Sequence, residues 1–197
     1  LDLANSSLNS LFIKGIAKGD LPIENFKSYI AQDSFFLEAF ARAYGMAIAK
    51  SPDKKSLAIL SKLLNGVIEE LHLHESYLKK WEVRSETISL NLATEKYTNF
   101  LKEISQQKSM IEIISAMTPC MRLYSWLGKS LQSKYQFSSN PYKEWVNAYS
   151  DLNFENLANS LEEIIDSNYQ KNNLIEIESL YKKAMGLELK FFEAYSP

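Results

Sequence analysis

The chain has 197 residues and a formal net charge of −2 at pH 7, with 46% hydrophobic and 23% charged residues. This length suits one domain with a substantial core, and we expect residues 1–197 to form a single domain. The composition is typical of a soluble globular protein. A near-neutral charge without a long basic run argues against nucleic-acid binding as the main role.

Two further features bear on the compartment. The single cysteine has no partner for an internal disulfide, which fits a reducing compartment. No apolar run approaches the roughly 18 residues that a membrane-spanning helix needs. We therefore expect a cytoplasmic protein without a membrane partner.

Apolar residues recur every three or four positions along most of the chain, a spacing that predicts amphipathic helices. Pro22 can open a helix at its first turn, and Ser51 is a plausible cap after the next break. The predicted helices cover residues 3–18, 23–50, 53–81, 92–104, 109–135, a segment after Pro141, 154–169 and 174–195. Residues 82–91 are polar and β-branched, which indicates a loop. Seven or eight helices without alternating strands predict an all-α bundle.

Two acidic residues fall on helix faces that should be apolar. Asp33 and Glu188 each share a face with aromatic residues spaced by three or four positions. The two stripes are Phe26, Tyr29, Phe36, Phe40 and Tyr44 around Asp33, and Tyr181, Ala184, Phe191 and Tyr195 around Glu188. Burying an unpaired carboxylate costs several kcal/mol, so such residues are usually paired, protonated or functional.

The only cysteine, Cys120, lies on a third apolar stripe with Tyr124 four residues further on. A lone cysteine with apolar neighbours is usually a small core side chain, and most aromatic stripes are core as well. Two inward carboxylates, an inward thiol and several inward phenols nevertheless indicate a pocket. Tyr97, Tyr124 and Tyr149 are candidates for stacking on a flat ring and hydrogen-bonding its edge.

The segment of residues 69–75 holds both histidines of the chain. Glu69 and His72 have the Glu-x-x-His spacing of di-iron bundles, but such sites need a second copy, which is missing. One histidine could ligate a haem iron, but nothing else in the sequence indicates a haem site. We interpret the segment as a solvated acidic face, with Glu70 and His74 paired at i, i+4, and expect no metal. The chain also lacks phosphate-binding glycine loops and a Gly-x-Ser-x-Gly elbow, which disfavours a nucleotidyl enzyme and a serine hydrolase.

Six motifs in chain order resemble those of the TenA/thiaminase II family. They are YIAQDSFFL at residues 29–37, Glu70-x-x-x-His74, KYTNFL at 96–101, AMTPCMRLY at 116–124, WVNAYS at 145–150 and ELKFFE at 188–193. The sequence around Cys120 is especially similar to that of the plant and cyanobacterial branch of the family. The matches extend over about the whole chain, so the resemblance is to the complete family domain.

The resemblance implies a haem-oxygenase-like helical bundle that binds no haem or other cofactor and assembles as a homotetramer (or homodimer). It implies hydrolysis of 4-amino-5-aminomethyl-2-methylpyrimidine to the 5-hydroxymethyl pyrimidine and ammonia in thiamin salvage, with thiamin as another possible substrate. Cys120 would be the nucleophile and Glu188 the proton shuttle to a ring nitrogen. Asp33 would read the 4-amino group and is a candidate for activating the thiol.

The predicted substrate-binding residues are Asp33, Phe36, Tyr97, Tyr124, Tyr149 and Phe191. Phe36 stands where many family members have tyrosine, so its ring can stack but cannot donate a hydrogen bond. Two other classes of function stay open at this point. One is a non-catalytic aminopyrimidine-binding or regulatory protein, and the other is a metal or haem oxygenase on a similar bundle.

Overall fold

A computed structural model describes residues 2–82 and 88–197, and all regular structure in these ranges is helical. The α-helices are α1 (Asp2–Asn9), α2 (Leu11–Lys18), α3 (Ile23–Ala49), α4 (Lys54–Lys80), α5 (Leu92–Gln107), α6 (Met110–Lys134), α7 (Lys143–Ser150), α8 (Leu152–Asn168) and α9 (Leu174–Glu193). The predicted all-α class is confirmed. None of the helices in the described ranges combines the length and the apolarity that a membrane crossing requires.

The described ranges contain nine α-helices rather than seven or eight, because the opening segment is divided. Ser10 ends the first helix and caps the second, since its hydroxyl accepts a hydrogen bond from the Ile13 N–H at 3.3 Å. Gly19 then ends α2 with a positive φ of 77°. Of the predicted loop at 82–91, residues 83–87 lie outside the described residues, and Ile88 to Asn91 are not helical.

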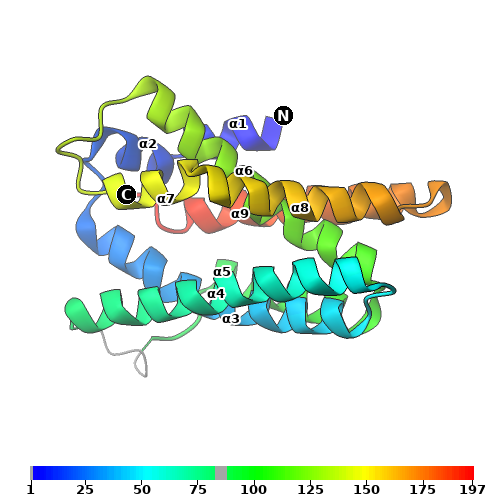
Figure 1. The fold of residues 1–197 in the computed structure, drawn as a ribbon. Coiled ribbons are helices and arrows are strands. Elements are labelled where there is room, and N and C mark those ends of the chain that lie inside the picture. The colour runs from blue at the N-terminus through cyan, green and yellow to red at the C-terminus, as the bar shows by residue number, and fades with distance from the viewer. Residues whose placement is uncertain (1, 83–87) are drawn as a thin grey trace.

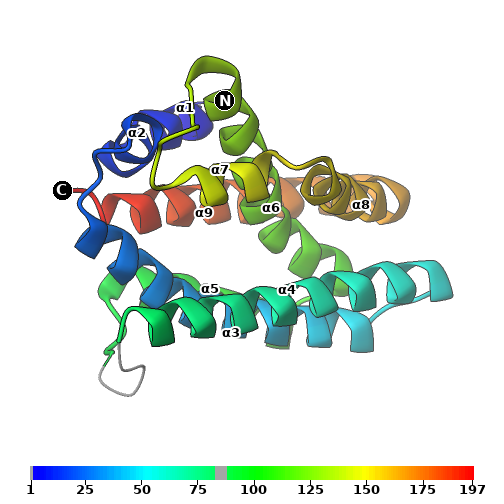
Figure 2. The ribbon, with the colours of Figure 1, turned by 60° about the vertical axis from the view of Figure 1, so that its left-hand side comes forward.

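The helices form two layers (Figure 1). Helices α3, α4 and α5 make one layer and α7, α8 and α9 the other, while α6 runs obliquely between them and packs on both. The view turned by 60° shows the same two layers, with α1 and α2 at one end of the molecule (Figure 2). Residues from both layers therefore converge on one interior.

Helix α6 is the central element of this interior. It is buried around most of its circumference, which is expected of a helix that lies inside a bundle. Two of its buried hydroxyls are satisfied locally: Ser115 donates to the carbonyl of Ile111 at 2.7 Å and Thr118 to that of Ile114 at 2.8 Å. Pro119 lies inside the helix without ending it.

Gly128 lets α7 approach α6 closely enough to bring Tyr149 to the interior. A Cβ at Gly128 would lie 2.5 Å from the carbonyl carbon of Tyr149 and 2.6 Å from the nitrogen of Ser150. Both of these are backbone atoms, so neither can move aside as the end of a side chain would. A glycine is therefore required at this crossing.

We expect Gly128→Ala to lower the free energy of unfolding by about 1–3 kcal/mol, the usual cost of overpacking a core. Gly66→Ala is the matched control, because a Cβ at this position in α4 has nothing within 4 Å. That control should raise stability by about 0.5–1 kcal/mol, since alanine favours a helix interior. Urea denaturation measures both variants, and equal effects would contradict the close approach.

Candidate active site

A small enclosed cavity lies between the two layers, where α3, α4, α6 and α7 meet. Its lining side chains are Asp33, Phe36, Leu37, Phe40, Val67, Glu70, Cys120, Met121, Tyr124, Tyr149 and Phe154. The cavity volume is about 20 Å³, which is room for about one water molecule. A ring-sized ligand therefore enters only when lining side chains move.

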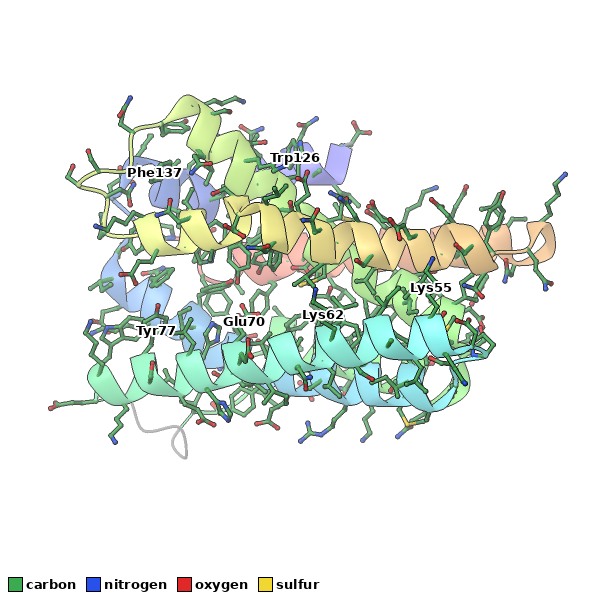
Figure 3. The ribbon with its side chains drawn as sticks, viewed as in Figure 1. Lys55, Lys62, Glu70, Tyr77, Trp126 and Phe137 are labelled. Atoms are coloured by element: carbon green, nitrogen blue, oxygen red, sulfur yellow. The ribbon has the colours of Figure 1, made fainter. Side chains whose placement is uncertain are left out.

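A groove of about 520 Å³ opens to the surface beside the cavity, between α4, residues 138–142 and α7. Glu70 and Tyr149 line both the groove and the cavity. Figure 3 shows Glu70 and Tyr77 on the side of α4 that faces α7. The Tyr149 hydroxyl donates to Glu70 Oε1 at 2.9 Å, so a hydrogen bond joins the two residues that line both spaces.

Glu188 and Cys120 form the first chemical unit of the site. Glu188 is 1% exposed, and Tyr97 donates a hydrogen bond to its Oε1 at 2.7 Å. Burial raises the pKa of the Glu188 carboxyl to about 7, although the hydroxyl of Tyr97 and the thiol of Cys120 act to lower this pKa. The pKa of the Cys120 thiol is raised well above its usual range, first by burial and then by the nearby charges of Glu188, Asp33 and Glu70. The resting cysteine is thus a protonated thiol close to a carboxyl group whose pKa is about 7.

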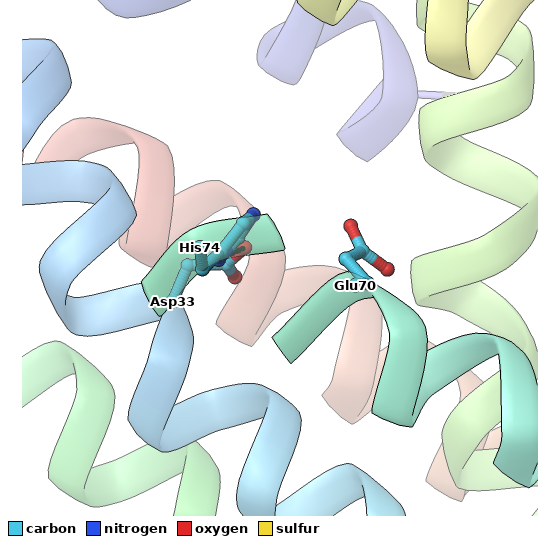
Figure 4. Close-up of side chains that lie close together, drawn as sticks. All are labelled: Asp33, Glu70 and His74. Carbon is cyan, nitrogen blue, oxygen red and sulfur yellow. Dashed lines mark ion pairs between the residues drawn. The ribbon is translucent and has the colours of Figure 1, made fainter. Parts of the chain in front are cut away.

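Asp33, Glu70 and His74 form the second unit (Figure 4). One ligand atom of each lies within 4.8 Å of the others, and His74 Nδ1 is 3.7 Å from Asp33 Oδ2. Burial, followed by the charges of Glu70 and Glu188, raises the pKa of Asp33 well above its usual range. Burial lowers the pKa of His74 to about 4, so its imidazole is neutral at neutral pH. The unit therefore combines two carboxyl groups with raised pKa values and one neutral imidazole, and we interpret it as an acid–base cluster, in which Tyr149 already donates to Glu70.

Aromatic rings surround these groups. Phe36 lines the cavity and packs at 4.7 Å between ring centroids on Tyr97 and at 6.2 Å on Phe191. Tyr124 and Tyr149 meet edge to face at 4.7 Å on the other side. Among the aromatic residues predicted to bind the substrate, Phe36, Tyr124 and Tyr149 line the cavity directly. Tyr97 and Phe191 support it through Phe36.

The interpretation of residues 69–75 as a solvated face is wrong for two of its members. Glu69 and His72, the pair with di-iron spacing, are exposed. His74 is only 4% exposed and faces Asp33 rather than pairing with Glu70, which lines the cavity. The signal was present in the sequence, because the apolar stripe of α4 steps through this position: its members are Leu63, Val67, Glu70, His74 and Leu78.

A sequence profile of the TENA/THI-4/PQQC family matches residues 4–196. The chain belongs to this family. Solved structures of TenA proteins have the same fold: one titled a TenA family transcription regulator, from Silicibacter sp. TM1040, superposes with a TM-score of 0.91 at 21% identity, over 99% of this chain and 92% of that one. A TenA homologue from Pyrococcus furiosus superposes with a TM-score of 0.91 at 19% identity, over 98% of this chain and 94% of that one. The resemblance to the TenA family and the predicted fold are thereby confirmed.

Two named proteins are similar to this chain in sequence. The mitochondrial bifunctional TH2 protein of Arabidopsis thaliana is 35% identical over 95% of this chain, which spans 34% of that protein's length. An aminopyrimidine aminohydrolase of Halalkalibacterium halodurans is 27% identical over 94% of this chain and 86% of its own length. The chain is therefore similar to one part of a plant protein and to nearly all of a bacterial one.

The raised pKa of Glu188 predicts a pH-dependent contribution to stability. The ordinary value is 4.5 and the folded value is about 7, so the contribution is fully present below pH 4.5 and is lost as the pH rises through 7. We expect the free energy of unfolding of the wild type to fall relative to Glu188→Gln by about 3 kcal/mol across this window. Urea denaturation from pH 4 to 8 measures the difference. A difference that does not change with pH would mean that the carboxyl titrates at its ordinary value.

Proposed function

We propose that the protein is an aminopyrimidine aminohydrolase of the thiaminase II type. Its substrate would be 4-amino-5-aminomethyl-2-methylpyrimidine, which it hydrolyses to the 5-hydroxymethyl pyrimidine and ammonia in thiamin salvage. The observation that carries this proposal is the Cys120 thiol, which lines an aromatic cavity and lies close to Glu188, a buried carboxyl group with a pKa of about 7. The aminopyrimidine aminohydrolase name of the Halalkalibacterium relative supports the same activity.

The first step is addition of the Cys120 sulfur to the electron-poor pyrimidine ring. Because the resting cysteine is a thiol, its proton has to leave as the carbon–sulfur bond forms. Glu188 is the carboxyl group whose charge acts most strongly on the thiol, and its pKa near neutrality suits it to accept a proton and pass it to a ring nitrogen. Tyr97 holds the carboxyl group in place. This geometry favours Glu188 over Asp33 for activating the thiol.

The second step releases the amine from the exocyclic carbon. The electron pair of the carbon–nitrogen bond leaves with the nitrogen, which carries a further proton and departs as ammonia, while the ring nitrogen returns its proton to Glu188. Water then adds to the exocyclic carbon, and the sulfur departs from the ring with its proton restored. The sum is one water consumed and one ammonia released for each pyrimidine.

Asp33 would recognise the aminopyrimidine edge. Its carboxyl group lines the cavity and has a raised pKa, so it can hold a proton for a ring nitrogen while accepting a hydrogen bond from the 4-amino group. Phe36 and Tyr149 would flank the ring, and Tyr124 would orient the thiol, with Tyr97 and Phe191 behind Phe36.

The decisive test is Cys120→Ser. We expect turnover, measured as ammonia release from the aminomethyl pyrimidine, to fall by about 10³-fold or more, because a serine hydroxyl is a far weaker nucleophile than a thiol. Binding of the pyrimidine, measured by calorimetry, should change little. Near-normal turnover in the variant would remove Cys120 from the chemistry, and a wild type that binds the pyrimidine without releasing ammonia would favour a binding or regulatory protein.

The assembly and the location stay predictions from the family resemblance. We propose a homotetramer, with a homodimer as the alternative, and a cytoplasmic location. An apolar groove on α3 and α5, lined by residues such as Phe35, Met46 and Leu90, is one surface that a second copy would cover. Native mass spectrometry of the purified chain measures the state directly.

A further inference from the structure

Glu70 occupies a position that the steps above leave without a role. It projects from α4 at the boundary of the enclosed cavity and the surface groove, and it lines both (Figure 3). Tyr149 is its hydrogen-bond partner at 2.9 Å. A leaving group that moves from the cavity to the surface through this groove would therefore pass the carboxyl group of Glu70.

The proposed reaction needs one more proton transfer than the ring-facing groups supply. An amine leaves a carbon atom readily only when it departs with a proton, because the amide anion is a very poor leaving group. Cys120 and Glu188 act on the ring in the proposed steps, and Asp33 faces His74, with 3.7 Å between Asp33 Oδ2 and His74 Nδ1. Among the carboxyl groups that line the cavity, Glu70 is the one that also reaches the groove.

We propose that Glu70 is a further catalytic residue that carries the proton with which the leaving nitrogen departs. This inference rests on the proposed function. The Glu70 carboxyl group shares a proton with the exocyclic nitrogen, the carbon–nitrogen bond breaks with its electron pair on nitrogen, and neutral ammonia leaves through the groove. The water that then adds to the exocyclic carbon gives one proton to the Glu70 carboxylate, which restores the starting state.

The surroundings of Glu70 suit this role. The titratable groups around it include Asp33 from α3, His74 from its own helix, Cys120 and Tyr124 from α6 and Tyr149 from α7. Its charge also acts on Tyr29 and Tyr44 of α3. Burial raises the pKa of Glu70, and the hydrogen bond from Tyr149 opposes this increase. An acid whose pKa lies closer to neutrality transfers a proton more efficiently at neutral pH.

The test compares two leaving groups in Glu70→Gln. One substrate is the aminomethyl pyrimidine, whose nitrogen must depart with a proton. The other is its 5-(trimethylammoniomethyl) analogue, whose nitrogen has a fixed positive charge and departs as neutral trimethylamine. Cleavage is measured in a single turnover with enzyme in excess, so that only the bond-breaking steps count.

We expect Glu70→Gln to slow cleavage of the aminomethyl substrate by about 10²–10³-fold, the usual contribution of a general acid. Cleavage of the trimethylammonio analogue should fall less than about 10-fold, because it needs no proton. Glu69→Gln is the matched control, since Glu69 precedes Glu70 in the same helix and is exposed; it should leave both rates unchanged. Equal losses for the two substrates in Glu70→Gln, or no loss for either, would overturn the inference.

The wild type provides a second test that does not depend on the variant folding. Groups that act on the ring, such as Cys120 and Glu188, affect both substrates, so their titrations appear in both pH–rate profiles. The profile of the aminomethyl substrate should show one additional alkaline decrease, where the shared proton is lost. Identical profiles would also overturn the inference, whereas a wild type that cleaves neither substrate would overturn the proposed function instead.

Discussion

Three carboxyl groups and one thiol, those of Asp33, Glu70, Glu188 and Cys120, lie together between two layers of helices. Removing a carboxylate from water without a partner costs several kcal/mol, and three of them in one interior also repel one another. Burial raises the pKa of each of these groups, because it disfavours their charged forms. For Glu188 the resulting pKa of about 7 suits proton transfer at neutral pH, so the desolvation that lowers stability also serves the chemistry.

The carboxyl groups are not equivalent, because each has a different neighbour. Tyr97 donates to Glu188, Tyr149 donates to Glu70, and Asp33 faces the neutral imidazole of His74. Different environments give chemically identical side chains different proton affinities and hence different tasks. On this view Glu188 serves the ring, and Glu70 serves the leaving group at the mouth of the groove. In the proposed mechanism, the two sides of the scissile bond would therefore meet different carboxyl groups.

The sequence was most informative where polar residues interrupt an apolar stripe. Asp33 and Glu188 were recognised in this way, and Cys120 was assigned to the pocket because Tyr124 lies on the same helix face. Glu70 and His74 obey the same periodicity on α4, but exposed polar residues at Glu69, His72 and Glu75 surround them and conceal the stripe. In such a polar segment, the buried face is found only by stepping three or four residues at a time from the apolar residues on either side, here Leu63 and Leu78.

The sequence by itself determined the helical class, the approximate bounds of the helices and the faces on which Asp33, Cys120 and Glu188 lie. These properties depend on residues three or four positions apart, so they are local. Only the tertiary structure decided which groups meet: Tyr97 and Glu188 are 91 residues apart, and Glu70 and Tyr149 are 79 residues apart. Such contacts depend on how the layers pack, including the close approach at Gly128. Proton affinities follow from those contacts and from burial, and for this reason they belong to the folded molecule alone.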